Sequence, residues 1–128
     1  MKNDSYFITT PIYYPSGNPH MGHAYSSIIA DVLARFKRLE GKKVFYLTGT
    51  DEHGLKIQRE AEKNNKDPKI FCDELSKKFK NLTQILNLTN DDFIRTTEKR
   101  HYKSVEEIWN RLVKSGDIYL DKYKGWYS

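Results

Sequence analysis

Two histidines have the residue type and spacing best suited to chemistry in this sequence. His20 and His23 enclose Met21 and Gly22, and they directly follow a loop that holds three of the four prolines. A helical pattern begins here, and the first turn of a helix carries unpaired N–H groups and a partial positive charge that bind phosphate well. Residues three apart lie on one side of that turn, where imidazole N–H groups can stabilise charge on a phosphoryl group. Taken by itself, the pattern also fits a metal site or histidines that merely lie near a helix cap.

A second polar segment has a comparable position in the sequence. Residues 48–54, Thr-Gly-Thr-Asp-Glu-His-Gly, lie at the end of a predicted strand. Ligands of open α/β sheets bind at the carboxyl ends of the strands, so this segment and the two histidines are expected to converge as a nucleotide site. Gly22 has no side chain, which lets a phosphate or a flat base approach the backbone closely. The glycine patterns of dinucleotide-binding proteins and P-loop ATPases are absent from the sequence.

Alternating strand and helix patterns must position these two segments. Residues 6–10 are rich in β-branched and aromatic side chains, residues 21–39 repeat apolar residues at helical spacing, and residues 43–48 form a second strand pattern. A strand–helix–strand unit of this length suits a right-handed parallel crossover, and the whole alternation predicts an α/β fold. Further along the chain, we expect helices at about 55–64, 68–86 and 98–115, a short strand at 92–97, and a small hairpin formed by residues 118–120 and 126–127.

Length and composition narrow the class of protein. The chain has 128 residues, a size typical of one domain, and its formal net charge of +5 favours a phosphate-bearing partner without identifying one. The single cysteine, Cys72, excludes a disulfide framework and a zinc site made of several cysteines, and we expect it to be a buried structural thiol. No apolar run approaches the roughly 18 residues of a membrane span, and no signal-peptide core is present. We therefore expect a cytoplasmic protein with no membrane partner.

Several segments resemble one enzyme family. Residues 11–23, with the sequence Pro-Ile-Tyr-Tyr-Pro-Ser-Gly-Asn-Pro-His-Met-Gly-His, resemble the first signature of class I aminoacyl-tRNA synthetases, the HIGH motif. That motif specifies only the class, and its Tyr-Pro-Ser-Gly is also similar to the leucine enzymes. Residues 48–54 resemble a segment of the methionyl-tRNA synthetases and select methionine over leucine. Residues 92–101 and 116–119 are similar to the bacterial form of that family, so the resemblance covers nearly the whole chain.

The resemblance implies a fold and a set of site residues. Residues 1–128 would be the N-terminal half of a Rossmann-like parallel-sheet nucleotide-binding domain, left incomplete, and about residues 117–128 would enter its connective insertion. Asp51 would hold the α-ammonium group of methionine, although it could also cap the helix that follows. By the same resemblance, Ile12, Tyr14 and His53 would join Asp51 in binding methionine, while His20 and His23 would be the catalytic residues at the ATP phosphates and Gly22 would face the adenine.

The activity implied by the resemblance is the ligation of methionine to tRNA. The methionine carboxylate attacks the α-phosphorus of ATP, with Mg²⁺ neutralising charge, and methionyl-adenylate and pyrophosphate form before the acyl group passes to tRNA(Met). No covalent enzyme intermediate is needed, so positioning and electrostatic stabilisation supply the rate. Two other hypotheses stay open on the sequence alone: another class I ligase of the leucine type, and a stand-alone nucleotide-binding remnant.

The sequence departs from the family pattern in two respects. The second class signature, a Lys-Met-Ser-Lys-Ser loop that binds the phosphates, is absent from the 128 residues, as are the later strands and the helical anticodon-binding domain. We therefore expect this polypeptide alone to be inactive and the missing parts to lie on the same chain. Gly125, Trp126 and Tyr127 precede Ser128, where many relatives begin a Cys-x-x-Cys zinc knuckle, so no zinc site is expected.

Overall fold

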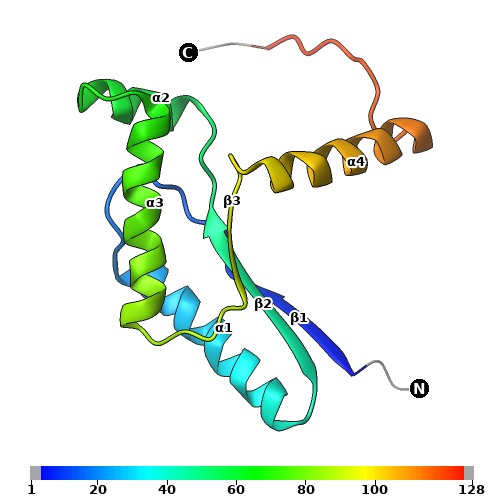
Figure 1. Cartoon of the computed structure of the whole chain (residues 1–128). Helices are drawn as coiled ribbons and strands as arrows, with labels where there is room; N and C mark the ends of the chain where they lie inside the picture. Colours follow the sequence, from blue (N-terminus) through cyan, green and yellow to red (C-terminus); the bar gives the residue numbers. More distant parts are fainter. Residues whose placement is uncertain (1–3, 126–128) are drawn as a thin grey trace. The chain divides into compact units, whose positions relative to one another are not determined.

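The computed structural model describes residues 4–125, which divide into two compact units at Thr97 and Glu98. The first unit holds a parallel sheet and three helices, and the second holds one helix and the segment after it (Figure 1). The predicted α/β alternation is confirmed. The elements of the first unit are β1 (Ser5–Thr9), α1 (Met21–Leu39), β2 (Lys43–Thr50), α2 (Leu55–Lys63), α3 (Pro68–Ile85) and β3 (Asp92–Arg95), and the second unit contains α4 (Lys99–Ser115).

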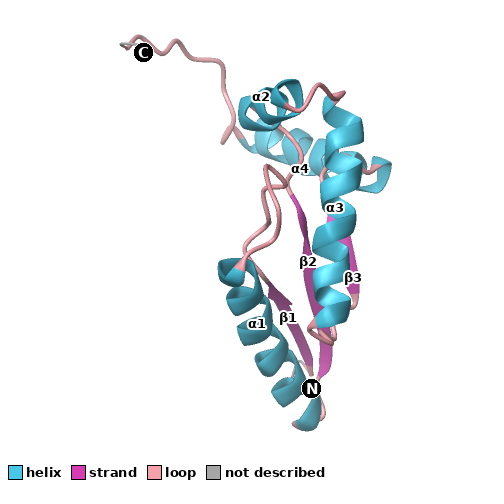
Figure 2. Cartoon of the chain, turned by 90° about the vertical axis from the view of Figure 1, so that its left-hand side faces the viewer, coloured by secondary structure: helices cyan, strands magenta, loops and turns pink. Residues whose placement is uncertain are grey.

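The three strands form one parallel sheet in the order β1-β2-β3. β1 pairs with the first part of β2, with Phe7 opposite Phe45, and β3 pairs with the last part, with Ile94 opposite Gly49. Each connection moves one strand further in the same direction, so right-handed crossovers place the helices on a single face of the sheet. Figure 2 shows α1 and α3 on this shared face.

Helix α1 packs on the sheet through its small side chains. Ala30 and Ala34 are buried against Tyr46, and Ile8 and Val44 of the sheet pack around them. Alanines let the helix approach the strands closely, and the space that remains is filled by the large ring of Tyr46, whose hydroxyl donates to the carbonyl of Ser27 at 3.0 Å. The bulky apolar residues that recur at helical spacing share another face, which is exposed: Ile28, Ile29, Val32, Leu33 and Phe36.

Hydrogen bonds and an ion pair from α1 set the position of β3. The Asp31 carboxylate of α1 accepts two hydrogen bonds of 2.6 Å from Thr89, one from its backbone and one from its hydroxyl. Arg38 of the same helix reaches Asp91 at 2.8 Å, and Asp91 in turn accepts from the backbone of Tyr46 at 2.7 Å. These bonds fix the chain just before β3 and so determine where β3 begins.

Helices α2 and α3 make a separate apolar cluster. Ile57 and Ala61 of α2 pack against Phe71, Cys72 and Leu75 of α3, and all five are buried. Asp67 caps α3, accepting from the backbone N–H groups of the second and third helical residues, and a proline occupies the first helical position. The expected buried thiol at Cys72 is confirmed, and burial raises the pKa of this thiol to about 11.

The second unit contains one helix and no strand in its described part. Helix α4 ends at Gly116, which has a left-handed φ of 84°, as expected for the residue that closes a helix. The predicted hairpin is wrong for residues 118–120, which are irregular; Tyr119 and Leu120 are exposed, and a lone two-stranded hairpin has little stability. Its second predicted strand, 126–127, lies outside the described residues. No helix within residues 4–125 has the length and apolar character needed to span a membrane.

Candidate functional site

The two histidines cap helix α1 reciprocally. Nδ1 of His20 accepts from the backbone N–H of Gly22 at 3.1 Å, and Nδ1 of His23 accepts from the backbone N–H of His20 at 3.1 Å. This arrangement satisfies two of the unpaired N–H groups of a helix start in the manner of a capping box. Because Nδ1 accepts in both rings, each neutral imidazole carries its proton on Nε2. The helix N-terminus therefore presents two fixed imidazole N–H donors.

The ring of His23 is held in an aromatic setting. It lies edge-on to Tyr13, with centroids 5.1 Å apart, and edge-on to Phe79 of α3, with centroids 4.9 Å apart. Burial, followed by the nearby charge of His20, holds the pKa of His23 below its ordinary value. The ring is therefore neutral at pH 7 and keeps Nδ1 free to accept. The centroids of the two histidine rings are 3.9 Å apart.

Gly22 lies exposed between the two histidines. A Cβ at this position would lie 3.0 Å from Cε1 and 3.1 Å from Nδ1 of His20, closer than most carbon contacts. A larger residue would press on the ring and disturb the bond that caps the helix. Gly22 is thus needed for the geometry of His20, in addition to leaving the backbone open.

Tyr13 joins the loop after β1 to the end of β2. Its backbone donates to Gly49 at 3.0 Å and its carbonyl accepts from Asp51 at 2.8 Å, while its hydroxyl lies 2.5 Å from Oγ of Ser27 in α1. Tyr13 is 3% exposed. The sequence analysis did not identify Tyr13 as a site residue. The available signal was its extended segment, because alternate side chains of such a segment point to opposite sides, so Tyr13 and its two neighbours are expected to differ in burial.

The neighbours of Tyr13 are open to solvent. Ile12 and Tyr14 are both 45% exposed. The Asp51 carboxylate raises the pKa of the Tyr14 hydroxyl, first by its charge and then by hydrogen bonding. The structure therefore brings together two predicted methionine-site residues, Tyr14 and Asp51, from segments that lie far apart in the sequence, with Ile12 on the same extended segment.

Asp51 is not a helix cap. The N-cap of α2 is Gly54, with a φ of 106° and no side-chain bond to the helix. Asp51 is half-buried, and its Oδ1 lies 3.5 Å from the backbone N of His53. His53 is exposed, and its Nε2 lies 3.3 Å from the carbonyl of Thr96. The alternative reading of Asp51 as a cap is therefore excluded, which leaves its carboxylate available for a ligand.

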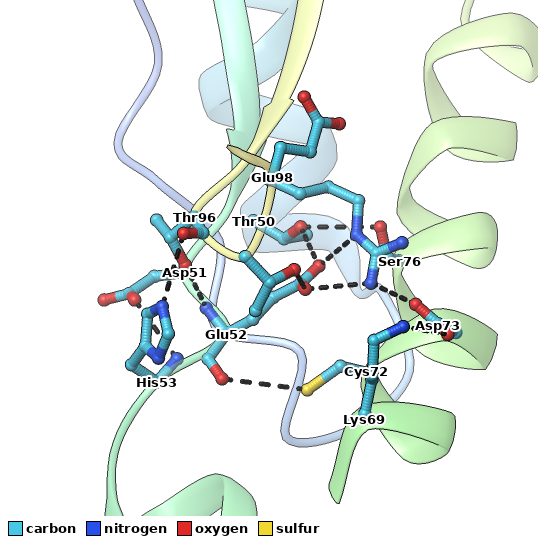
Figure 3. A network of polar contacts seen from close by, with 12 residues as sticks. Thr50, Asp51, Glu52, His53, Lys69, Cys72, Asp73, Ser76, Thr96 and Glu98 are labelled. Carbon is cyan, nitrogen blue, oxygen red and sulfur yellow. Dashed lines mark hydrogen bonds and ion pairs between the residues drawn. The ribbon is translucent and has the colours of Figure 1, made fainter. Parts of the chain in front are cut away.

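Glu52, which sequence reasoning did not single out, is the centre of a buried network. Arg95 binds its two oxygens in a bidentate pair at 2.7 and 2.9 Å, and the hydroxyls of Thr50 and Thr97 donate to it at 2.8 and 2.5 Å. Arg95 also reaches Asp73 of α3 at 2.5 Å. Figure 3 shows Asp73 and Ser76 facing this network from α3. The available signal was a carboxylate that follows one predicted strand, 43–48, and an arginine within another, 92–97.

No group of three or more His, Cys, Asp or Glu side chains that could hold a metal ion occurs in the described range, 4–125. The site thus consists of two imidazole donors at a helix N-terminus and a carboxylate beside a tyrosine at the end of β2. The first can bind phosphate and the second can bind a cationic group.

Comparisons with known proteins agree on one family. The family model for tRNA synthetases class I (M) matches residues 6–128. Similar relatives include "Methionine--tRNA ligase" of Mesorhizobium japonicum, 55% identical over 128 residues, and that of Lactiplantibacillus plantarum, 57% identical over 124 residues. These alignments cover 100% and 97% of this chain but 25% and 18% of the relatives.

A solved structure gives the same result. The chain is similar to Mycobacterium tuberculosis methionyl-tRNA synthetase in complex with methionyl-adenylate, with a TM-score of 0.91 and 46% identity. The match covers 97% of this chain and 24% of that one. This chain therefore spans about a fifth to a quarter of the length of the proteins it matches. With the family model matching nearly every residue, the chain belongs to the methionyl-tRNA synthetases, a family of class I tRNA synthetases.

Proposed function

We propose that this chain contributes to the catalytic domain of a methionine–tRNA ligase, which activates methionine with ATP and transfers it to tRNA(Met). One observation carries the proposal: two imidazole donors at the start of α1 and a half-buried carboxylate after β2, beside Tyr14, follow the ends of adjacent parallel strands. The protein of M. tuberculosis to which it is similar was solved with methionyl-adenylate, a ligand that needs both kinds of site.

Asp51 is proposed to bind the α-ammonium group of methionine. Among residues 4–125 it forms no ion pair with a cationic side chain, and it is only half-buried. A carboxylate in this setting offers a charge-assisted hydrogen bond to an ammonium group. Tyr14 and Ile12 would supply aromatic and aliphatic walls for the thioether chain, which is soft and apolar. His53 would border the same pocket.

His20 and His23 are proposed to act on the phosphates of ATP. Their Nε2–H groups and the helix N-terminus would stabilise negative charge as the methionine carboxylate oxygen bonds to the α-phosphorus. The bond from the α-phosphorus to the bridging oxygen breaks, and pyrophosphate leaves with its electron pair. Mg²⁺ would enter with ATP, held mostly by the phosphates. Gly22 would leave room for the adenine.

The remaining partners follow from the coverage of the relatives. The proposal places the rest of the catalytic domain and the anticodon-binding domain on the same polypeptide, since the aligned part covers only 25% and 18% of the matched relatives. As a component of translation, the protein would act in the cytoplasm.

Exchange of pyrophosphate into ATP, measured with each amino acid in turn, tests the proposed function. The assay uses the full-length polypeptide that carries this segment. Methionine alone is expected to support exchange, because activation is reversible and Asp51 and Tyr14 orient one substrate. Exchange with leucine in place of methionine would support the leucine-type ligase instead. Binding of ATP with no exchange for any amino acid would support a nucleotide-binding remnant.

A further inference from the structure

The side chains of three consecutive residues after β2 lie on two different sides of the backbone. Asp51 is half-buried and His53 is exposed, whereas the side chain of Glu52 is 0% exposed. The segment is extended, so successive side chains point to opposite sides. Figure 3 shows Asp51 and His53 on one side of the backbone, away from Asp73 and Ser76 of α3. The residue proposed to bind substrate is thus directly followed by one that points into the protein.

The buried carboxylate of Glu52 is held by hydrogen bonds at both of its oxygens. Both of its oxygens accept from Arg95, in a bidentate pair that fixes the plane of the carboxylate. Burial raises the pKa of Glu52, but hydrogen bonds, led by that from Arg95, outweigh it and hold the pKa below its ordinary value. Glu52 is therefore ionised at neutral pH, and a buried charge with this many partners has little freedom to move.

Arg95 extends the constraint to a second element. Besides Glu52, it binds the Asp73 carboxylate of α3 at 2.5 Å, and Lys69 of the same helix lies 3.7 Å from Asp73. The chain after β2 is thereby tied to the end of β3 and to the first half of α3. Displacing Glu52 would require breaking an ion pair that connects three elements of the unit.

The backbone on both sides of Asp51 is also fixed. The N–H of Asp51 donates to the carbonyl of Tyr13 at 2.8 Å, and the N–H of Glu52 donates to the hydroxyl of Thr96 at 2.8 Å. Two consecutive peptide groups are held, and the side chain that follows them is anchored. The direction in which the Asp51 carboxylate leaves the chain is therefore determined before any substrate arrives.

We propose that Glu52, anchored by Arg95 and Asp73, is a positioning residue of the methionine site, which holds Asp51 where the α-ammonium group of the substrate binds. The inference rests on the proposed function and deepens it. Pre-organisation of this kind matters because a binding group that is already held in place has less freedom to lose when the substrate binds, which improves the affinity for that substrate.

The test is Glu52→Gln in the full-length polypeptide, which keeps the shape of the side chain and removes its charge. The KM for methionine in ATP–pyrophosphate exchange is expected to rise about tenfold, with kcat and the KM for ATP changed less than about threefold. The second readout is the inhibition constant of 4-(methylsulfanyl)butanoate, which is methionine without its α-amino group. That constant is expected to stay within about twofold, since the inhibitor lacks the group that Asp51 binds.

A matched control tests whether the effect depends on the buried position of Glu52 or follows from any Glu-to-Gln change. Glu74→Gln makes the same change on α3, where Glu74 pairs with Lys66 at 2.5 Å on the exposed surface. All three constants are expected to stay at the values of the unsubstituted protein. Asp73→Asn is the second test variant, for use if Glu52→Gln does not fold. It removes one partner of Arg95 and leaves Glu52 charged, so a smaller rise in the methionine KM is expected.

Two results would overturn the inference. One is a folded Glu52→Gln variant with an unchanged KM for methionine. The other is an equal loss of affinity for methionine, ATP and the inhibitor, which would show that Glu52 only stabilises the fold. Absence of methionine-dependent exchange in the unsubstituted protein would instead overturn the proposed function, and the two failures are thus distinguishable.

Discussion

At the scale of single residues, the histidine pair combines a structural and a chemical task in the same rings. Nδ1 of each ring satisfies a backbone N–H at the start of α1, which leaves the proton on Nε2. The sequence predicted that both histidines lie on one side of the first turn. It could not predict the tautomer, because this depends on the extended backbone of His20 at the N-cap, with φ −138° and ψ 176°.

These two tasks can be separated by His20→Asn in the full-length polypeptide. Asparagine is a good N-cap and places a polar atom near the position of Nδ1, but it has nothing in place of Nε2. We expect the midpoint of thermal unfolding to change by no more than a few degrees, and single-turnover formation of methionyl-adenylate to slow by about 10²–10³-fold, the usual effect of one lost donor.

Met21→Leu is the control for His20→Asn. Met21 lies inside the same motif and is largely exposed, so neither the unfolding midpoint nor the rate should change. A His20→Asn variant that forms adenylate at the rate of the unsubstituted protein would show that His20 acts only as a cap.

At the scale of helices and strands, local patterns predicted most of the first unit. The helical spacing in residues 21–39 and the strand patterns before and after it agree with α1, β1 and β2. The side of α1 that is buried was not predictable from apolar spacing, because Ala30 and Ala34 pack on the sheet while the larger residues stay exposed. Which face of a helix is covered depends on the close approach that small side chains allow.

The site residues that could be predicted are those recognisable by their residue type. Residues that act through buried contacts could not be predicted. Asp51 and the two histidines stand out as polar groups at strand and helix ends. Glu52 and Tyr13 act through buried contacts with residues more than ten positions away in the sequence, such as Arg95 and Ser27. Such contacts follow from the packing of α3, β3 and α1, which a single sequence does not give.

The pairing of β2 with β3 depends on Gly49. A Cβ at this position would lie 1.9 Å from the carbonyl oxygen of Ile94 in β3, a distance that no side-chain adjustment can relieve. We expect Gly49→Ala to lower the free energy of unfolding by about 3 kcal/mol or more, since both strands must move apart. Urea unfolding followed by circular dichroism measures the change.

Gly17→Ala is the matched control for Gly49→Ala. A Cβ at Gly17 would meet no atom within 4 Å, so the free energy of unfolding should change by no more than about 0.5 kcal/mol. Equal stability of the two variants would contradict the close strand pairing at Gly49.

At the scale of the whole molecule, the chain leaves large apolar surfaces uncovered. Phe7 and Phe45 stack with centroids 5.9 Å apart on the sheet face opposite α1, and Phe7 is 64% exposed. The exposed face of α1 adds Ile29, Val32 and Phe36. Contiguous apolar surface of this kind normally lies against other protein. The aligned part covers only 25% and 18% of the relatives, so the proposed remainder of the catalytic domain would cover these faces.

The 128-residue polypeptide by itself is therefore expected to self-associate at micromolar concentration and to lack methionine-dependent exchange. Sedimentation velocity should show species heavier than 15.1 kDa, because burial of apolar surface drives association.

Val32→Lys places a charge in the exposed face of α1 and should lower the average mass without changing the unfolding midpoint. Asn110→Lys adds the same charge to exposed α4 without removing an apolar side chain, and should leave the mass unchanged. A monomeric polypeptide that unfolds cooperatively would contradict this expectation and favour a domain that is stable with these faces open.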